Sequence, residues 1–326
     1  MAARPPAYSI LSTPPDMSLT PRQQGLKERF DAELSTSAFD APWARLLKHS
    51  PDMFAASVRL AAVPKRRGSL SPKVQALISL AVASAATHLH VPNMHRYTRQ
   101  ALLAGASQAE IVETLCLTAT LGVHACNIGV PLLVEVLREQ GKELPRGMEG
   151  MSKEQWDMKD EFERKRGYWH AFWEDFLRLS PEFFGAYTEF SSVPWTQGVL
   201  EPKVGFVFLL LYYFPIPCLS SLFYICSFYH FLPFGYASLL PRYTHMSNPQ
   251  PQVKELIYCA FDASATHLYQ PGLKLHMQNV LKYGGTADEI MEVLELATLL
   301  SISTLDVGLP VLEEEARKFE ENQTAR

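Results

Sequence analysis

The residues VQALISLAVASAATHLH (74–90) decide the fold, because they place small or aliphatic side chains on every side of a helix. This pattern is typical of a helix buried inside a bundle of other helices. A second stretch of the same length and pattern, VKELIYCAFDASATHLY (253–269), follows 179 residues downstream. Both stretches contain Thr-His-Leu directly before their last residue, at 87–89 and at 266–268. They predict two equivalent buried helices in an all-α protein.

The repeat continues on both sides of these two stretches. Downstream, the offset of 179 holds as far as Glu135 and Glu314, and upstream an offset of 130 relates the two copies. The residues that recur at the offset of 130 include Trp43, Leu47, Pro51, Phe54, Pro64 and Gly68. We therefore predict two tandem helical bundles, residues 22–145 and 146–326, packed as an intramolecular pseudo-dimer, behind a flexible leader, residues 1–21.

The change of offset places 49 extra residues, 204–252, inside the second copy. No Asp, Glu, Lys or Arg occurs from Val204 to Pro241, and the segment is rich in Phe, Tyr and Leu. Its composition, its end residues and its sharp borders lead to the hypothesis of a translated, unspliced intron. The alternatives are a genuine amphiphilic insertion at a membrane interface and a membrane hairpin. Each apolar arm of such a hairpin is shorter than the roughly 20 residues that cross a bilayer.

Helix start and stop signals also occur twice. They are Gly105 and Gly284 as left-handed caps after helices over 93–104 and 273–283, and the capping boxes Ser107–Glu110 and Thr286–Glu289 at the start of helices that reach Leu121 and Leu300. Further amphipathic helices are expected around Trp43–Leu47 and Trp173–Leu177. Pro131 and Pro310 are expected in the first turn of the last helix of each copy.

The composition excludes several classes of protein. With 326 residues, 47% of them hydrophobic, the chain is a folded globular protein, and its net charge of −4 provides no positive field for nucleic acid. The five cysteines are scattered without a CxxC, which predicts buried thiols in a reducing, cytoplasmic compartment. The sequence has no phosphate loop, nucleophile elbow or nucleotide fingerprint, so we expect neither an organic cofactor nor a metal.

The order of apolar helix, histidine, glycine stop, capping box with a Glu-Ile-x-Glu core and Gly-x-Pro resembles the carboxymuconolactone decarboxylase and alkylhydroperoxidase D (AhpD)-like family. The resemblance covers about residues 70–140 and 253–318. It implies all-helical modules that self-associate. In the redox branch of the family, two cysteines precede a histidine by seven and four residues. Before His276 these positions hold Tyr269 and Gly272, so thiol peroxidase activity is disfavoured.

The decarboxylase branch is more similar to the second copy, and this similarity implies the candidate site. Glu255 matches its acidic residue at the start of a helix, and His276 matches its histidine eight residues before a glycine. We expect His276 to act as general acid/base, Glu255 to orient it and His267 to add a polar contact. The structural alternatives are a surface-facing histidine for His276, a helix C-terminal cap or a core histidine for His267, and a favourable acidic residue in a first helical turn for Glu255. The first copy has Ala76 and Tyr97 instead.

The secondary candidates are His88, His95 and Glu292. Glu292 could line an interior cleft or make a polar contact between helices. His88, His90, His95 and His124 are irregularly spaced and lack a paired carboxylate, which does not favour a zinc site.

The predicted function is a cofactor-independent lyase or isomerase, such as a decarboxylase, that acts on a small oxygenated carbon acid or lactone. The alternative is a non-catalytic tandem protein for ligand binding or assembly. Membrane contact is expected only if residues 204–252 are retained.

Overall fold

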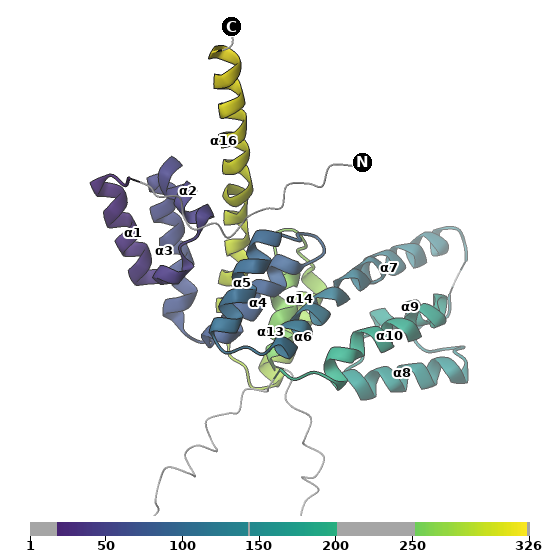
Figure 1. Cartoon of the computed structure of the whole chain (residues 1–326). Coiled ribbons are helices and arrows are strands. Elements are labelled where there is room, and N and C mark those ends of the chain that lie inside the picture. The colour runs from purple at the N-terminus through teal and green to yellow at the C-terminus, as the bar shows by residue number, and fades with distance from the viewer. Residues whose placement is uncertain (1–17, 143, 201–251, 325–326) are drawn as a thin grey trace, which may run out of the picture.

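The computed structural model describes residues 18–142, 144–200 and 252–324. Every regular element in these ranges is an α-helix or a 3-10 helix (Figure 1). The predicted all-α fold is therefore confirmed. The proposed insertion, apart from Gln252, and most of the expected leader lie outside the described residues.

Seven α-helices are described in each half of the chain. The first half contains α1 (Pro21–Leu34), α2 (Ala41–His49), α3 (Pro51–Arg67), α4 (Pro72–Ser84), α5 (Val91–Leu103), α6 (Gln108–Ala119) and α7 (His124–Glu139). The second half contains α8 (Lys153–Arg166), α9 (Phe172–Leu179), α10 (Pro181–Thr196), α13 (Gln252–Ala263), α14 (Gln270–Lys282), α15 (Ala287–Thr298) and α16 (Ser303–Thr324). Short 3-10 helices, Thr120–Val123 and Leu299–Ile302, join α6 to α7 and α15 to α16.

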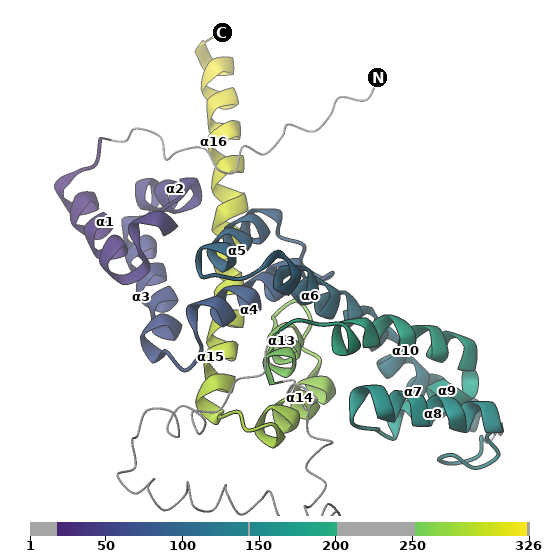
Figure 2. The same ribbon diagram turned by 60° about the horizontal axis from the view of Figure 1, so that its bottom comes forward.

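Helices α4 and α13 pack against each other at the centre of the molecule, each beside its own neighbour α5 or α14 (Figures 1 and 2). Leu77 and Ile78 of α4 and Leu256 and Ile257 of α13 are almost fully buried in one hydrophobic cluster. This position explains why most side chains of both helices are small or apolar, since neither helix has a face toward water. The charged residues of α13, Lys254, Glu255 and Asp262, are buried as well.

Both central helices are shorter than predicted. They end at Ser84 and Ala263, and the Thr-His-Leu residues form turns in which Leu89 and Leu268 have φ angles of 46° and 51°. This left-handed conformation cannot continue a right-handed helix. The histidines of these turns therefore lie outside the helices.

The outer helices of each half pack on the other half. Helices α2 and α3 contact α16 and α15, whereas α9 and α10 contact α7 and α6. Figures 1 and 2 show the two outer groups on opposite sides of the central helices. Each group has an aromatic cluster, around Phe54 and Trp43 in one and around Phe184 and Trp173 in the other. The two halves of the chain are therefore interlocked rather than merely adjacent.

The local helix signals have mixed outcomes. Both capping boxes are present, with the hydroxyls of Ser107 and Thr286 accepting from the N–H groups of the glutamates three residues later, and Gly105 and Gly284 have φ angles of 85° and 84°. The expected positions of the two late prolines are wrong. The 3-10 helices lead directly into α7 and α16, so both helices begin earlier and contain the prolines, Pro131 and Pro310, in their interior.

Helix α1 begins at Pro21, the last residue of the expected leader, with a capping box formed by Thr20 and Gln23. Among the described residues, the helical stretch Gln108–Glu139 is long and apolar enough to span a bilayer, with 39% of its most apolar window buried. Core helices of globular proteins pass the same test, and α6 packs against α4, α10 and α13.

Candidate active site

Glu255 and His276 form a hydrogen-bonded pair at the centre of the candidate site. Glu255 lies in the first turn of α13 and His276 in the middle of α14, and these helices pack side by side. The His276 Nδ1 atom lies 2.6 Å from Oε2 of Glu255, and the Asn279 amide donates to Oε1 at 3.2 Å. Glu255 is 0% and His276 6% exposed. The carboxylate therefore fixes the imidazole through Nδ1, and no described residue bonds to Nε2.

A buried cation lies beside this pair. Arg166, the last residue of α8, is 5% exposed and donates to the hydroxyls of Tyr258 and Tyr168 at 3.4 and 3.3 Å. No carboxylate in the described part of the chain lies within ion-pair distance of it. Burial lowers the pKa of Arg166, but the interactions with the tyrosines and with Glu255 outweigh this effect and leave it raised. The guanidinium is therefore charged, dry and without a direct anionic partner.

A small cavity connects these groups. It has a volume of about 30 Å³ and its lining includes His124, Arg166, Tyr258 and His276. The His276 ring stacks on Tyr258 with centroids 4.4 Å apart. Burial raises the pKa of Tyr168, which also lines the cavity, to about 12, so its hydroxyl stays protonated. The space holds one or two water molecules, so a substrate enters only when the lining side chains move apart.

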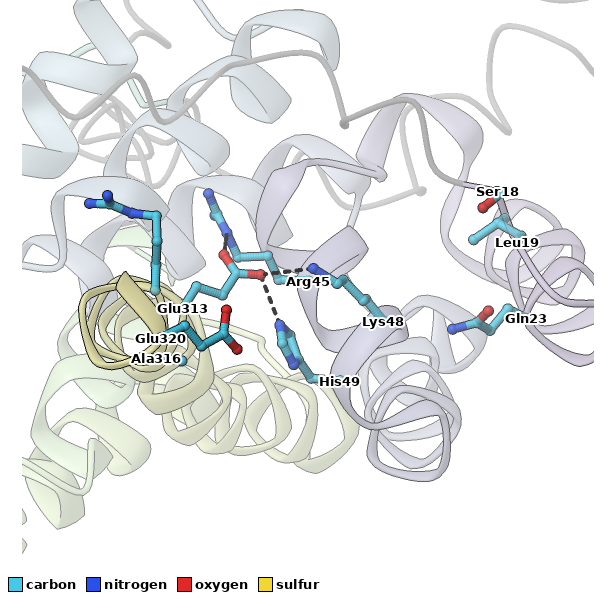
Figure 3. A pocket seen from close by; sticks show the side chains of 10 residues that line it. Ser18, Leu19, Gln23, Arg45, Lys48, His49, Glu313, Ala316 and Glu320 are labelled. Atoms are coloured by element: carbon cyan, nitrogen blue, oxygen red, sulfur yellow. Dashed lines mark hydrogen bonds and ion pairs between the residues drawn. The ribbon is translucent and has the colours of Figure 1, made fainter. Parts of the chain in front are cut away.

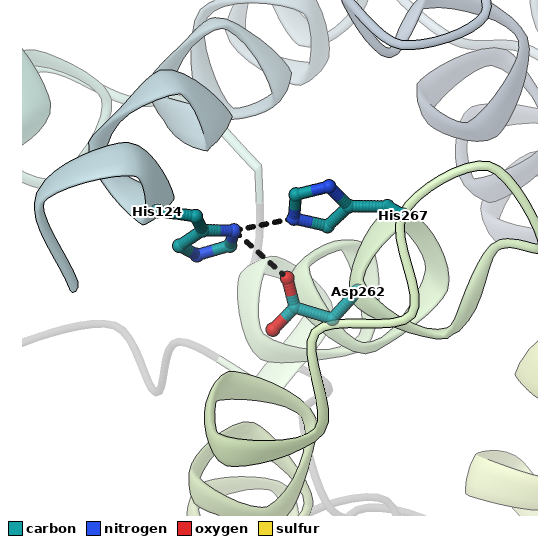
Figure 4. Close-up of side chains that lie close together, drawn as sticks. All are labelled: His124, Asp262 and His267. Atoms are coloured by element: carbon teal, nitrogen blue, oxygen red, sulfur yellow. Dashed lines mark hydrogen bonds and ion pairs between the residues drawn. The ribbon is translucent and has the colours of Figure 1, made fainter. Parts of the chain in front are cut away.

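His267 belongs to a second group at the edge of the same site (Figure 4). Its Nε2 atom lies 2.5 Å from Nδ1 of His124, the first residue of α7, and that Nδ1 lies 3.7 Å from Oδ1 of Asp262 in α13. Burial, together with His267 and His276, lowers the pKa of His124 to about 3. Burial and the nearby Glu255 raise the pKa of Asp262 to about 8. His267 is thus brought to His124 and Asp262, and it does not line the cavity.

The secondary candidates do not join this site. His88 stacks on His90 with ring centroids 5.5 Å apart, and His95 is an exposed residue of α5. Glu292 is fully buried and accepts hydrogen bonds from the backbone N–H groups of Ser69 and Leu70 at 2.7 and 3.2 Å. It also accepts from the side-chain amide of Gln75 in α4 at 2.7 Å. Glu292 therefore makes a polar contact between helices, the alternative to a cleft.

Three residues of the site were not identified from the sequence: Arg166, Tyr258 and Asp262. His124 was considered only as part of an irregularly spaced group of histidines. A usable signal exists only for Asp262, which is the single charged residue in the otherwise apolar or small run 256–266. Arg166 lies in the strongly charged helix α8, where nothing in the sequence separates it from Arg164 and Lys165. The site residues that the sequence did not reveal have only their position in space in common, since the fold brings α7, α8 and α13 together there.

The structure explains why a glycine, Gly272, occupies one of the cysteine positions of the redox branch. A Cβ atom there would collide with Asp262 and with the ring of Tyr269. The close approach of Asp262 therefore requires glycine at this position.

The larger hollows lie elsewhere. A groove of about 690 Å³ between α2 and α16 contains Glu313, which pairs with Arg45, Lys48 and His49 at 3.2, 3.6 and 2.8 Å (Figure 3). Its carboxylate is thus already paired with two cations and bonded to a histidine. A cavity of about 390 Å³ is lined mainly by the first half, beside Ala76 and Tyr97, the positions that correspond to Glu255 and His276. Neither hollow contains a buried acid–histidine pair.

The comparisons with known proteins agree with this architecture. Residues 51–125 match the model of the carboxymuconolactone decarboxylase family. The chain is similar to the crystal structure of a candidate gamma-carboxymuconolactone decarboxylase subunit from Burkholderia xenovorans LB400, with 36% sequence identity and a TM-score of 0.69. The match covers 91% of this chain and 97% of that chain. No curated protein matches the chain. The resemblance predicted from the sequence is confirmed, and the chain belongs to the carboxymuconolactone decarboxylase family.

Proposed function

We propose that the chain is a lyase or isomerase that acts on a small oxygenated carbon acid or lactone without an organic cofactor. The observation that carries this proposal is the buried His276–Glu255 pair, 2.6 Å between Nδ1 and Oε2, at the wall of a cavity that also contains a charged arginine. A histidine fixed through one nitrogen can transfer a proton through the other. Glu255 acts as the positioning residue in this arrangement.

The reaction that fits these groups is decarboxylation next to a carbonyl group. The bond between the substrate carbon and its carboxylate breaks, carbon dioxide leaves, and the electron pair moves into the carbonyl to form an enolate. In its imidazolium form, with Nδ1–H held by Glu255, His276 then delivers its Nε2 proton to the carbon and regains a proton from water for the next turnover. Isomerisation by proton transfer uses the same residues, since it also passes through an enolate.

Arg166 supplies the charge that such an intermediate needs. A fixed guanidinium in a water-poor site stabilises a developing oxyanion more strongly than it does in water. The hydroxyl of Tyr258 lies 3.4 Å from an Arg166 Nη atom and 3.2 Å from the Trp195 indole nitrogen, which keeps both groups in place. We propose that the enolate oxygen of the substrate binds against Arg166.

We further infer that the chain consists of two tandem modules, residues 22–145 and 146–326, packed as a pseudo-dimer, and that only the second module is catalytic. Reciprocal contacts support the inference. Glu113 of the first half accepts from the N–H of Leu200, and Glu292 of the second half accepts from the N–H of Leu70. The loss of the acid–histidine pair in the first half supports the restriction to the second.

A second candidate function is ligand binding without turnover. It is favoured by the cavity of about 390 Å³ in the first half, where Tyr97 and Ala76 replace the acid–histidine pair. In that case a carbon acid raises the melting temperature of the protein while its concentration stays constant, since ligand binding alone stabilises the folded state.

The test is turnover of gamma-carboxymuconolactone and of simple lactone acids and β-keto acids by the full chain and by the His276→Gln and Glu255→Gln variants. We expect kcat of His276→Gln to fall by about 10²–10⁴-fold. Tyr97→Phe, the matched change in the first half, should leave kcat unchanged. Turnover by His276→Gln at the rate of the unaltered chain would refute the role of His276.

A further inference from the structure

We propose that His124, Asp262 and His267 form a binding site for a divalent transition-metal ion, with Zn²⁺ as the best fit (Figure 4). The three residues come from the start of α7, the end of α13 and the turn that follows α13. One ligand atom from each lies within 4.8 Å of the others. This site is independent of the acid/base role of His276, because the metal uses none of the atoms of the His276–Glu255 pair.

The donor set selects the class of metal. Two imidazole nitrogens and one carboxylate oxygen are typical ligands of zinc and its late first-row neighbours, whereas Mg²⁺ and Ca²⁺ prefer oxygen ligands. Ligand atoms about 2.1 Å from a tetrahedral ion are about 3.4 Å apart. The observed separations of 2.5 Å between the imidazoles and 3.7 Å between His124 and Asp262 lie on either side of this value. Side-chain shifts of about 1 Å therefore give metal-ligand geometry.

The carboxylate gives the independent reason for a cation. Asp262 is 0% exposed, and neither of its oxygens has a hydrogen-bond partner among the described residues. A buried carboxylate without donors is costly, whereas a bound cation compensates for its lost hydration. The other acidic group close to it, Glu255, is bonded to His276 and Asn279 and adds negative charge to this region. A cation between Asp262 and the two imidazoles removes this imbalance.

The equivalent positions in the other half provide the contrast. At the offset of 179, Asp262 corresponds to Ala83, His124 to Ser303 and His267 to His88. Ser303 is bonded to the amide of Asn93 at 2.7 Å, and Ala83 has no ligand atom. The fold therefore builds the three-ligand set at only one of two equivalent places, and His88 is the natural control for His267.

The experiment is a titration of the full chain, purified without a metal-affinity tag and dialysed against chelator, with Co²⁺ alone and then with Zn²⁺ as competitor. We expect one Co²⁺ per chain with the intense visible absorption of a tetrahedral site, displaced by one equivalent of Zn²⁺. His267→Ala and Asp262→Asn should weaken Zn²⁺ binding by about 100-fold or more, whereas His88→Ala should bind as the unaltered chain does.

His267 lies in a partly exposed turn, so its variant provides the test even if Asp262→Asn does not fold. Circular dichroism of each variant checks the fold. Absence of the Co²⁺ absorption together with an unchanged melting temperature in Zn²⁺ would overturn the proposal, as would full affinity in His267→Ala. If no metal binds, His124, Asp262 and His267 form a cluster that exchanges protons and is not a metal site.

Discussion

The hydroxyl oxygens of Thr87 and Thr266 lie 3.2 Å apart, although the residues are 179 positions apart in the sequence. The 179 positions equal the offset of the sequence repeat, so each threonine contacts the residue that corresponds to it in the other copy. A contact between equivalent residues supports the two-fold pseudo-dimer that we propose. Because of it, a polar contact in one half often has a counterpart in the other half, which provides matched controls for mutagenesis.

The ion pair of Lys254 with Glu113 should make a large contribution to stability. The Lys254 Nζ atom lies 2.8 Å from Glu113 Oε1, and the two side chains are 6% and 4% exposed. Glu113→Gln leaves a buried ammonium group without its counterion. The free energy of unfolding should fall by about 3–5 kcal/mol, measured by urea denaturation.

The equivalent pair in the other half, Gln75 with Glu292, has a neutral donor in place of the lysine. Gln75 occupies the position of Lys254 and donates to Glu292 at 2.7 Å. Glu292→Gln removes no counterion, so we expect a smaller loss of about 1–2 kcal/mol. Equal losses in the two variants would show that burial of the lysine charge is not the cause.

Replacement of Arg166 by lysine should lower the activity even though the positive charge is retained. The planar guanidinium donates to Tyr168 and Tyr258 and lies over the Trp195 ring, 4.5 Å from its centroid, and a lysine cannot make all of these contacts. For Arg166→Lys we expect kcat/KM to fall by about 10–100-fold. The control is Arg164→Lys on the exposed side of the same helix. Unchanged kinetics of Arg166→Lys would exclude contact between the guanidinium and the reacting groups.

Stability should fall in mildly acidic solution, partly through His90. Burial, together with His88 and Arg96, lowers the pKa of His90 from 6.5 to about 4. Its Nδ1 also accepts the N–H of Asn93 as the cap of α5, which a protonated ring cannot do. Between these two pKa values the unfolded chain binds a proton that the folded chain does not. Stability is therefore full above pH 6.5 and decreases as the pH falls toward 4.

The measurement is the free energy of unfolding at pH 7 and pH 4.5, in the unaltered chain and in His90→Asn, whose amide also caps helices. The variant should lose less stability between the two values, by up to about 3 kcal/mol. His124 titrates in the same direction in both proteins, so it cancels in the difference. An identical pH dependence of the two proteins would contradict the prediction.

Deletion of residues 204–252 should leave a folded protein. The sequence repeat places Lys203 directly before Val253 in the shortened chain, at the position of Gln252. Gln252 is buried and donates to Glu289 at 2.9 Å, as Lys73 donates to Glu110 at 2.7 Å in the other half. In the shortened chain Lys203 should pair with Glu289, as Lys73 pairs with Glu110. The melting temperature should therefore equal or exceed that of the full chain.

The matched control deletes residues 203–251 instead, so that Gln252 itself follows Pro202. Both shortened chains should fold, and the one with lysine should be the more stable in low salt, because an ion pair with Glu289 replaces the hydrogen bond from a neutral amide. Failure of both to fold would show that the segment is an integral part of the protein.

The sequence alone determined the all-α fold, the positions of the capping boxes and the glycine caps. These features depend on contacts within a few residues, so a local pattern is enough to predict them. It also identified Glu255 and His276, which the structure brings together, although their pairing was inferred from a family resemblance. It misplaced the ends of α4 and α13, because the left-handed residues Leu89 and Leu268 carry no local signal such as glycine.

The tertiary structure alone decided which side chains surround that pair. Arg166, His124 and Asp262 belong to α8, α7 and α13, and no periodicity connects them. They meet because the outer helices of one half pack on the other half, and this packing depends on the burial of apolar surface over the whole chain. The same packing removes Arg166 and Asp262 from water without a direct ionic partner. Burial, which only the three-dimensional fold defines, gives these two residues their chemical character.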